Sequence, residues 1–90
     1  MNRCPVDIAR LSLLCQRILD AEVLTETDGT ALLGAAEAAG RALEAGDAEA
    51  ARRHVEEVAR CTEAFVRAGA LAPAEGGAVL ETTRRLLDGS

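Results

Sequence analysis

The sequence predicts an all-α fold, a four-helix bundle built from two consecutive helical hairpins in up-down-up-down order. Of its 90 residues, 49% are apolar, with Ala the main contributor, and Phe65 is the single aromatic residue. Ala, Leu, Glu and Arg rank high in helix propensity, whereas the β-branched and aromatic residues that favour strands are sparse. A chain of this length has one modest core, so we expect a single domain over residues 1–90.

A stretch that occurs twice indicates the two hairpins and a pseudo-two-fold relation between them. Residues 24–33 read LTETDGTALL, and residues 71–80, 47 positions later, read LAPAEGGAVL. Each copy places a hydrophobic anchor before a turn, then an acid that complements the positive end of a helix, and then the residues of a buried face. Two copies are typical of a pseudo-symmetric bundle, since a solenoid needs at least three repeats.

The first helix is predicted over residues 5–23. Pro5 suits the first turn of a helix, where its missing N–H would be unpaired anyway, and Asp7 complements the positive helix end. Apolar residues recur at helical spacing and define one buried face. These residues are Ile8, Leu11, Leu14, Cys15, Ile18, Leu19 and Val23.

The second helix is predicted over residues 28–45, between two turn signals. Thr25 or Thr27 is the expected N-cap, and Gly46 suits the left-handed residue that follows a helix. The apolar face is narrow and made mostly of small residues, so another helix could approach it closely. This face comprises Leu32, Leu33, Ala36, Ala39, Gly40 and Leu43.

The third and fourth helices are predicted over residues 48–68 and 73–88. Asp47 fits an N-cap, Gly69 fits a helix end, and Pro73 fits a first turn. The two-residue break before the third helix implies antiparallel neighbours. The expected buried faces are Ala51, Val55, Val58, Thr62 and Phe65 in the third helix, and Val79, Leu80, Thr83, Leu86 and Leu87 in the fourth.

Composition and charge exclude several classes of function. The net charge of −5 argues against a nucleic-acid binder, which needs a basic footprint and, for single strands, stacking aromatics. No apolar run nears the ~20 residues that span a membrane, and no signal peptide is visible, so we expect a cytoplasmic protein. Arg without Lys, together with abundant Ala and Gly, favours a bacterial origin.

Two apolar regions are candidates for contact with another protein, or with a second copy of the chain in a homodimer. One is the small-residue face of the second helix, and the other is the pair of leucines near the C-terminus. The expected interaction surface comprises Gly34, Ala36, Gly40, Leu43, Leu86 and Leu87. The alternative is that both faces pack inside the monomer.

A pocket between the hairpins is an alternative site. His54 precedes Cys61 by seven residues on a similar face, and Cys15 of the first helix could supply a third metal ligand beside Phe65. Zinc ligands usually come in local pairs, and no such pair occurs here, so no metal or cofactor is expected. We expect Cys4, Cys15 and Cys61 to be free thiols, with one bridge between helices as the alternative, because an odd number of cysteines without local spacing does not indicate a disulfide scaffold.

A phosphorelay role is a further alternative. Residues 46–54 are similar to the helix that carries the phosphorylated histidine in histidine phosphotransfer domains, with His54 in that place. The family continues with a Lys and small residues, whereas Glu56, Glu57 and Val58 follow here. Because two carboxylates would repel a phosphoryl group, only a degenerate phosphotransfer-like domain is indicated.

The helix-boundary motifs resemble those of the FIMAH-type small helical domain. They are the stretch over residues 24–33, the corner LEAGDAEAA over residues 43–51, and the Gly-x-Leu turn that starts at Gly69. The resemblance covers nearly the whole chain and implies a helical fold with an accessory role and no catalytic residue. The sequence therefore predicts a small non-catalytic accessory or adaptor protein, not an enzyme, that binds a partner protein or itself.

Overall fold

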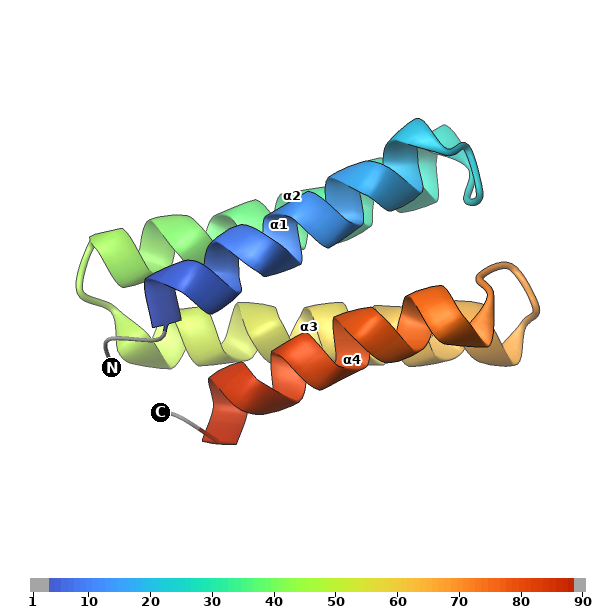
Figure 1. Ribbon diagram of the computed structural model, residues 1–90. Coiled ribbons are helices and arrows are strands. Elements are labelled where there is room, and N and C mark those ends of the chain that lie inside the picture. Colours follow the sequence, from blue (N-terminus) through green and yellow to red (C-terminus); the bar gives the residue numbers. More distant parts are fainter. Residues whose placement is uncertain (1–3, 89–90) are drawn as a thin grey trace.

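The computed structural model describes residues 4–88, with side chains described over residues 8–88, and this part of the chain forms four α-helices (Figure 1). They are α1 (Cys4–Asp20), α2 (Glu26–Glu44), α3 (Ala48–Arg67) and α4 (Pro73–Asp88). Each helix packs along its neighbours in sequence, and α1 packs against α4, while α1 and α3 occupy diagonal corners. The predicted all-α, up-down-up-down bundle is confirmed.

Most predicted helix boundaries are confirmed by the caps that form. Thr25 is the N-cap of α2 and accepts a hydrogen bond from the Asp28 N–H at 3.2 Å. Asp47 caps α3 in the same way, accepting from the Ala50 N–H at 3.0 Å. Gly46 and Gly69 adopt left-handed backbone conformations, with φ of 81° and 78°. Helices α2 and α3 therefore each end where a glycine reverses the chain.

The turn between α1 and α2 differs from the prediction. Helix α1 ends at Asp20 rather than at residue 23, and Glu22 adopts a φ of 56°. The reversal lets the buried Leu24 reach the core before Thr25 starts the next helix. Periodicity alone missed this boundary because Val23 continues the apolar pattern, although the chain has already turned.

The core confirms the pseudo-two-fold relation residue by residue. Side chains that lie 47 positions apart in the sequence occupy equivalent buried positions in the two hairpins. The α1–α2 turn and the α3–α4 turn each contribute a buried leucine to this core. The buried equivalent pairs are Ile8 and Val55, Leu11 and Val58, Cys15 and Thr62, Leu24 and Leu71, Leu32 and Val79, Ala35 and Thr82, Ala36 and Thr83, and Ala39 and Leu86.

The repeated glycine has a role in packing that the sequence did not indicate. Gly29 and Gly76 are buried in the first turns of α2 and α4. A Cβ atom on Gly29 would lie 2.7 Å from Leu19 Cδ1, and one on Gly76 would collide with Val66 Cγ2. Because only glycine lacks a Cβ, it lets each helix start directly against the end of the preceding helix.

Candidate functional site

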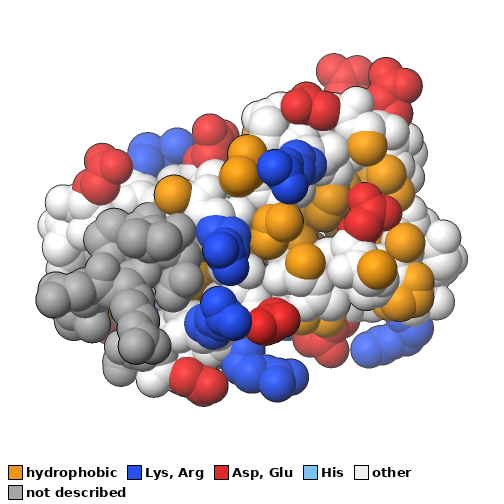
Figure 2. All heavy atoms as spheres, in the orientation of Figure 1, with side chains coloured by type: hydrophobic (Ala, Val, Ile, Leu, Met, Phe, Trp, Pro, Cys, Tyr) orange, Lys and Arg blue, Asp and Glu red, His pale blue; other side chains and the backbone are white. Residues whose placement is uncertain are grey.

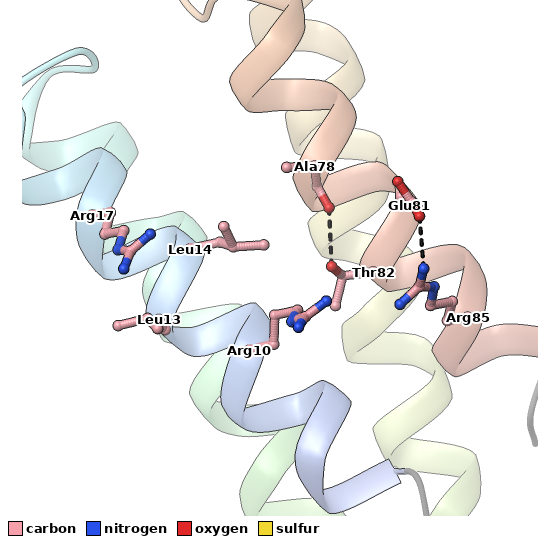
Figure 3. A pocket seen from close by; sticks show the side chains of 8 residues that line it. All are labelled: Arg10, Leu13, Leu14, Arg17, Ala78, Glu81, Thr82 and Arg85. Atoms are coloured by element: carbon pink, nitrogen blue, oxygen red, sulfur yellow. Dashed lines mark hydrogen bonds and ion pairs between the residues drawn. The ribbon is translucent and has the colours of Figure 1, made fainter.

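A groove of about 400 Å³ lies between α1 and α4 (Figure 3). Its walls come from the first and last helices, which no loop connects. In Figure 3, Arg10 and Leu14 extend from α1 toward α4. The lining residues are Arg10, Leu13, Leu14 and Arg17 of α1, and Ala78, Glu81, Thr82 and Arg85 of α4.

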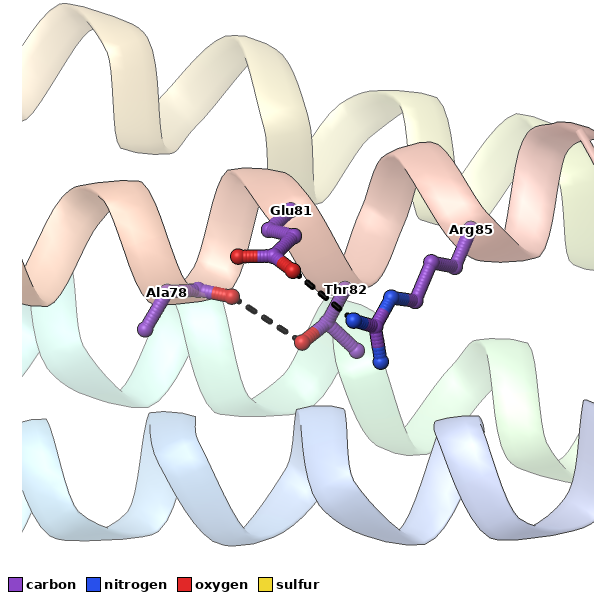
Figure 4. Close-up of polar contacts among 4 residues, drawn as sticks. All are labelled: Ala78, Glu81, Thr82 and Arg85. Atoms are coloured by element: carbon purple, nitrogen blue, oxygen red, sulfur yellow. Dashed lines mark hydrogen bonds and ion pairs between the residues drawn. The ribbon is translucent and has the colours of Figure 1, made fainter.

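The floor of the groove is effectively apolar. Leu14 is half-buried against the core, and Thr82 is buried. The Thr82 hydroxyl donates to the Ala78 carbonyl oxygen at 2.9 Å, so its hydrogen-bonding capacity is used within α4 (Figure 4). A ligand would meet the methyl groups of these side chains rather than an unpaired polar group.

Leu13 lies beside this floor and is 52% exposed. Within residues 8–88, it is the one large hydrophobic side chain that is exposed to this extent. Single exposed apolar residues are common on protein surfaces. Here, however, the exposed leucine lines the groove at its α1 edge, and in Figure 3 its side chain points away from α4.

The rim of the groove carries an excess of positive charge. Arg85 donates to Glu81 at 2.8 Å, and this exposed pair neutralises the α4 side (Figure 4). On the α1 side, Arg10 and Arg17 form no ion pair with any residue of the described part of the chain. Figure 2 shows arginine and hydrophobic side chains gathered along this face. The protein as a whole carries −5, so the groove is a local exception.

The two hairpins differ in side-chain size at the seams between them. The pseudo-equivalent seam, between α3 and α2, packs more closely than α1 and α4 do. Glu81 and Arg85 of α4 correspond to Gly34 and Ala38 of α2, 47 positions earlier. The long charged pair of α4 therefore lies in solvent at the edge of the groove, at positions where α2 has small residues.

The predicted interaction surface does not form one continuous patch. Ala36 and Leu86 lie in the core, so they are unavailable to a partner, and Leu87 is half-buried against that core. Gly34 is exposed, with no atom near the position of a Cβ. Gly40 and Leu43 line a second hollow of about 470 Å³, which also includes Ile8, Ala9, Ser12, Glu37, Arg41 and Glu44.

The residues of the alternative pocket are distributed through the core. Cys15 is 0% exposed, whereas Cys61 and Phe65 are half-buried and pack against the core from α3. Burial raises the pKa of the Cys15 thiol from its ordinary 9.0 to about 12, which opposes formation of the thiolate that binds metals. Cys15 and Cys61 are free thiols, whereas the side chain of Cys4 lies outside the described residues.

The described residues contain no metal-binding cluster of the predicted kind. Over this part of the chain, His, Cys, Asp and Glu do not converge as a group of three or more that could hold a metal ion. The structure therefore does not bring Cys15, His54 and Cys61 together as one ligand set. His54 lies half-buried on α3, and the phosphorelay reading of this histidine stays a prediction.

The groove could have been found in part from the sequence. Arg10 and Arg17 are seven residues apart and therefore lie on one face of α1, and Leu13 falls outside the apolar seam. The sequence did not indicate that α4 would stand off from this face. That separation depends on the relative positions of two helices that are distant in the chain.

Comparisons with known proteins add no identification. No protein-family model, curated protein or solved structure matches this chain. The resemblance to the FIMAH-type domain therefore stays a prediction from the helix-boundary motifs. In the described part of the chain, no helix combines the length and hydropathy required to cross a lipid bilayer.

Proposed function

We propose that this chain is a small non-catalytic adaptor protein that binds a helix of a partner protein in the groove between α1 and α4. The observation that carries the proposal is the exposed Leu13 beside an open apolar floor. Helix-in-groove recognition uses such a surface, with apolar anchors in the groove and polar contacts at its edges.

The size of the groove indicates a transient contact. Burying the exposed part of one leucine contributes on the order of 1 kcal/mol, since full burial of such a side chain contributes about 1.5–3 kcal/mol. Stable protein–protein interfaces bury about 1,200–2,000 Å² in total, which is more than one short groove offers. We therefore expect weak, reversible binding, as is common for adaptor modules.

The charge and the topology favour a different protein over a second copy. A second copy could offer Glu49, Glu56 and Glu63 of α3 to the basic groove. However, α1 and α3 lie at diagonal corners, so this contact would join two different surfaces of the two copies. Such contacts would continue head to tail into open chains rather than close a homodimer.

Site-specific photo-crosslinking in the organism that naturally contains this protein tests the proposal. A photoreactive residue replaces Leu13 in one variant and Arg60, the exposed residue 47 positions later, in a matched control. We expect one discrete protein adduct from position 13 and none from position 60. The identified protein is then purified and titrated against the wild-type chain, Leu13→Asp and Arg60→Asp.

The titration decides the outcome. The proposal expects Leu13→Asp to weaken binding at least tenfold, with Arg60→Asp close to wild type. Equal adducts from both positions, or equal affinities of both variants, would contradict it. A ladder of adducts between copies of this chain would instead support self-association.

A further inference from the structure

We infer that the helix bound in this groove is acidic, with two carboxylates seven residues apart and apolar residues between them. This inference rests on the proposed function and adds to it the chemistry of the partner. It follows from the spacing of two arginines, the position of two leucines and the state of the opposite rim.

The first step is the spacing of the charges. Arg10 and Arg17 are separated by seven residues of α1, which is about two helical turns or ~10.5 Å along the axis. Both line the groove, and neither is paired within the described residues. A second helix lying along α1 repeats its side chains at the same interval, so carboxylates at i and i+7 would match them.

The second step is the apolar centre. Leu13 and Leu14 lie between the two arginines in the sequence and on the groove. On the bound helix, the residues at i+3 and i+4 lie on the same face as those at i and i+7. Apolar side chains at those positions would therefore meet the leucines and the floor formed with Thr82.

The third step is the absence of competition from α4. The ion pair between Glu81 and Arg85 leaves that rim close to neutral, so it neither repels nor captures a carboxylate. The attraction thus comes from the α1 side alone and sets the register of the bound helix. Arginine is well suited to this role, because its planar fork binds a carboxylate through two parallel hydrogen bonds.

Designed peptides of known helicity test the inference by fluorescence anisotropy at low salt. The matching peptide is Ala-based, with Glu at i and i+7 and Leu at i+3 and i+4. A second peptide of the same composition has one Glu moved from i+7 to i+5, which turns it away from the groove. A third peptide replaces both Glu residues with Lys.

We expect the matching peptide to bind about tenfold more tightly than the displaced one, a difference of 1.4 kcal/mol. Its affinity should fall as salt rises from 0.02 to 0.3 M, because exposed charges are screened. The double variant Arg10→Glu/Arg17→Glu should lose this preference and bind the Lys peptide instead. Arg53→Glu/Arg60→Glu is the matched control: both arginines are exposed on α3, seven residues apart, and the change in net charge is the same.

The outcomes separate this inference from the proposed function. Equal binding of all three peptides, abolished by Leu13→Asp, would overturn the charge pattern and leave helix binding in place. Binding that Arg53→Glu/Arg60→Glu abolishes as fully as Arg10→Glu/Arg17→Glu does would overturn the inference as a general charge effect. If no peptide binds although the crosslinking test identifies a partner at Leu13, the acidic helix is wrong while protein binding stands.

Discussion

The two hairpins use equivalent positions for the fold and different residues at the seams between them. Both bury a leucine in the turn and a glycine in the first turn of the following helix. On α2 the core residues are mainly alanines, whereas α4 presents Thr82, Thr83 and Leu86. The shared positions build the bundle, and the differing ones place long charged side chains along the α1–α4 groove where the equivalent α2 positions have small residues.

The largest expected effect is in the core of the second hairpin. Leu86→Ala should lower the free energy of unfolding by about 2–5 kcal/mol, because Leu86 is buried and α4 cannot collapse fully onto the cavity. Its equivalent in the first hairpin, Ala39, is already small. Urea unfolding followed by circular dichroism measures the change. A loss below about 1 kcal/mol would mean that α4 is loosely packed. It would contradict a core position for Leu86 equivalent to that of Ala39.

Two adjacent glycines should respond in opposite directions to the same substitution. Gly76→Ala should destabilise by about 1–3 kcal/mol, because its methyl group collides with the short, stiff side chain of Val66. Gly77→Ala has open space and should stabilise by about 0.5–1 kcal/mol through helix propensity.

Thermal unfolding of Gly76→Ala, Gly77→Ala and Gly29→Ala measures the change in stability in both hairpins. At Gly29, the clashing atom is the flexible end of Leu19, so we expect a smaller loss than at Gly76. Stabilisation by Gly76→Ala would contradict the close approach of α3 and α4.

The Cys15 thiol should make stability depend on pH above about 9. Its pKa is raised from 9.0 to about 12 by burial, so the unfolded chain releases this proton first as the pH rises. The contribution is fully present below pH 9 and is lost at roughly 1.4 kcal/mol per pH unit as the pH rises toward 12. Urea unfolding at pH 8, 9 and 10 measures it.

Cys15→Ala should remove this part of the pH dependence, because alanine has no thiol to titrate. The equivalent residue in the other hairpin, Thr62, has no thiol either, so it does not replace the effect. An unchanged slope in that variant would place the pH dependence elsewhere.

The smallest effect is expected at a buried hydroxyl. The Thr83 hydroxyl donates to the Leu80 carbonyl oxygen at 2.8 Å within its own helix. Thr83→Val keeps the shape of the side chain. It removes both the hydrogen bond and the free-energy cost of burying the hydroxyl, so the free energy of unfolding should change by less than about 1 kcal/mol. A loss of 2 kcal/mol or more, measured by urea unfolding, would mean that the hydroxyl links α4 to another helix.

The sequence carried more information on the helices than on the groove. Caps and glycines are local signals, so Asp47 and Gly69 marked their boundaries correctly, whereas α2 begins at Glu26, two residues before its predicted start, because Thr25 rather than Thr27 is its N-cap. The 47-residue repeat predicted the pairing of the hairpins. The predicted contact surface was less successful, because Ala36 and Leu86 satisfy the same periodicity whether they face a partner or the core. Only the packing of the four helices in three dimensions separates those cases.

Backbone NMR of the ¹⁵N-labelled protein, titrated with the matching acidic peptide, tests the central claim most directly. The two equivalent seams are observed in one experiment. The account predicts chemical-shift changes that are confined to residues 10–17 and 78–85, around the open groove. Changes of equal or greater size at the equivalent residues 57–64 and 31–38 would contradict it, because binding would then not depend on where the hairpins differ.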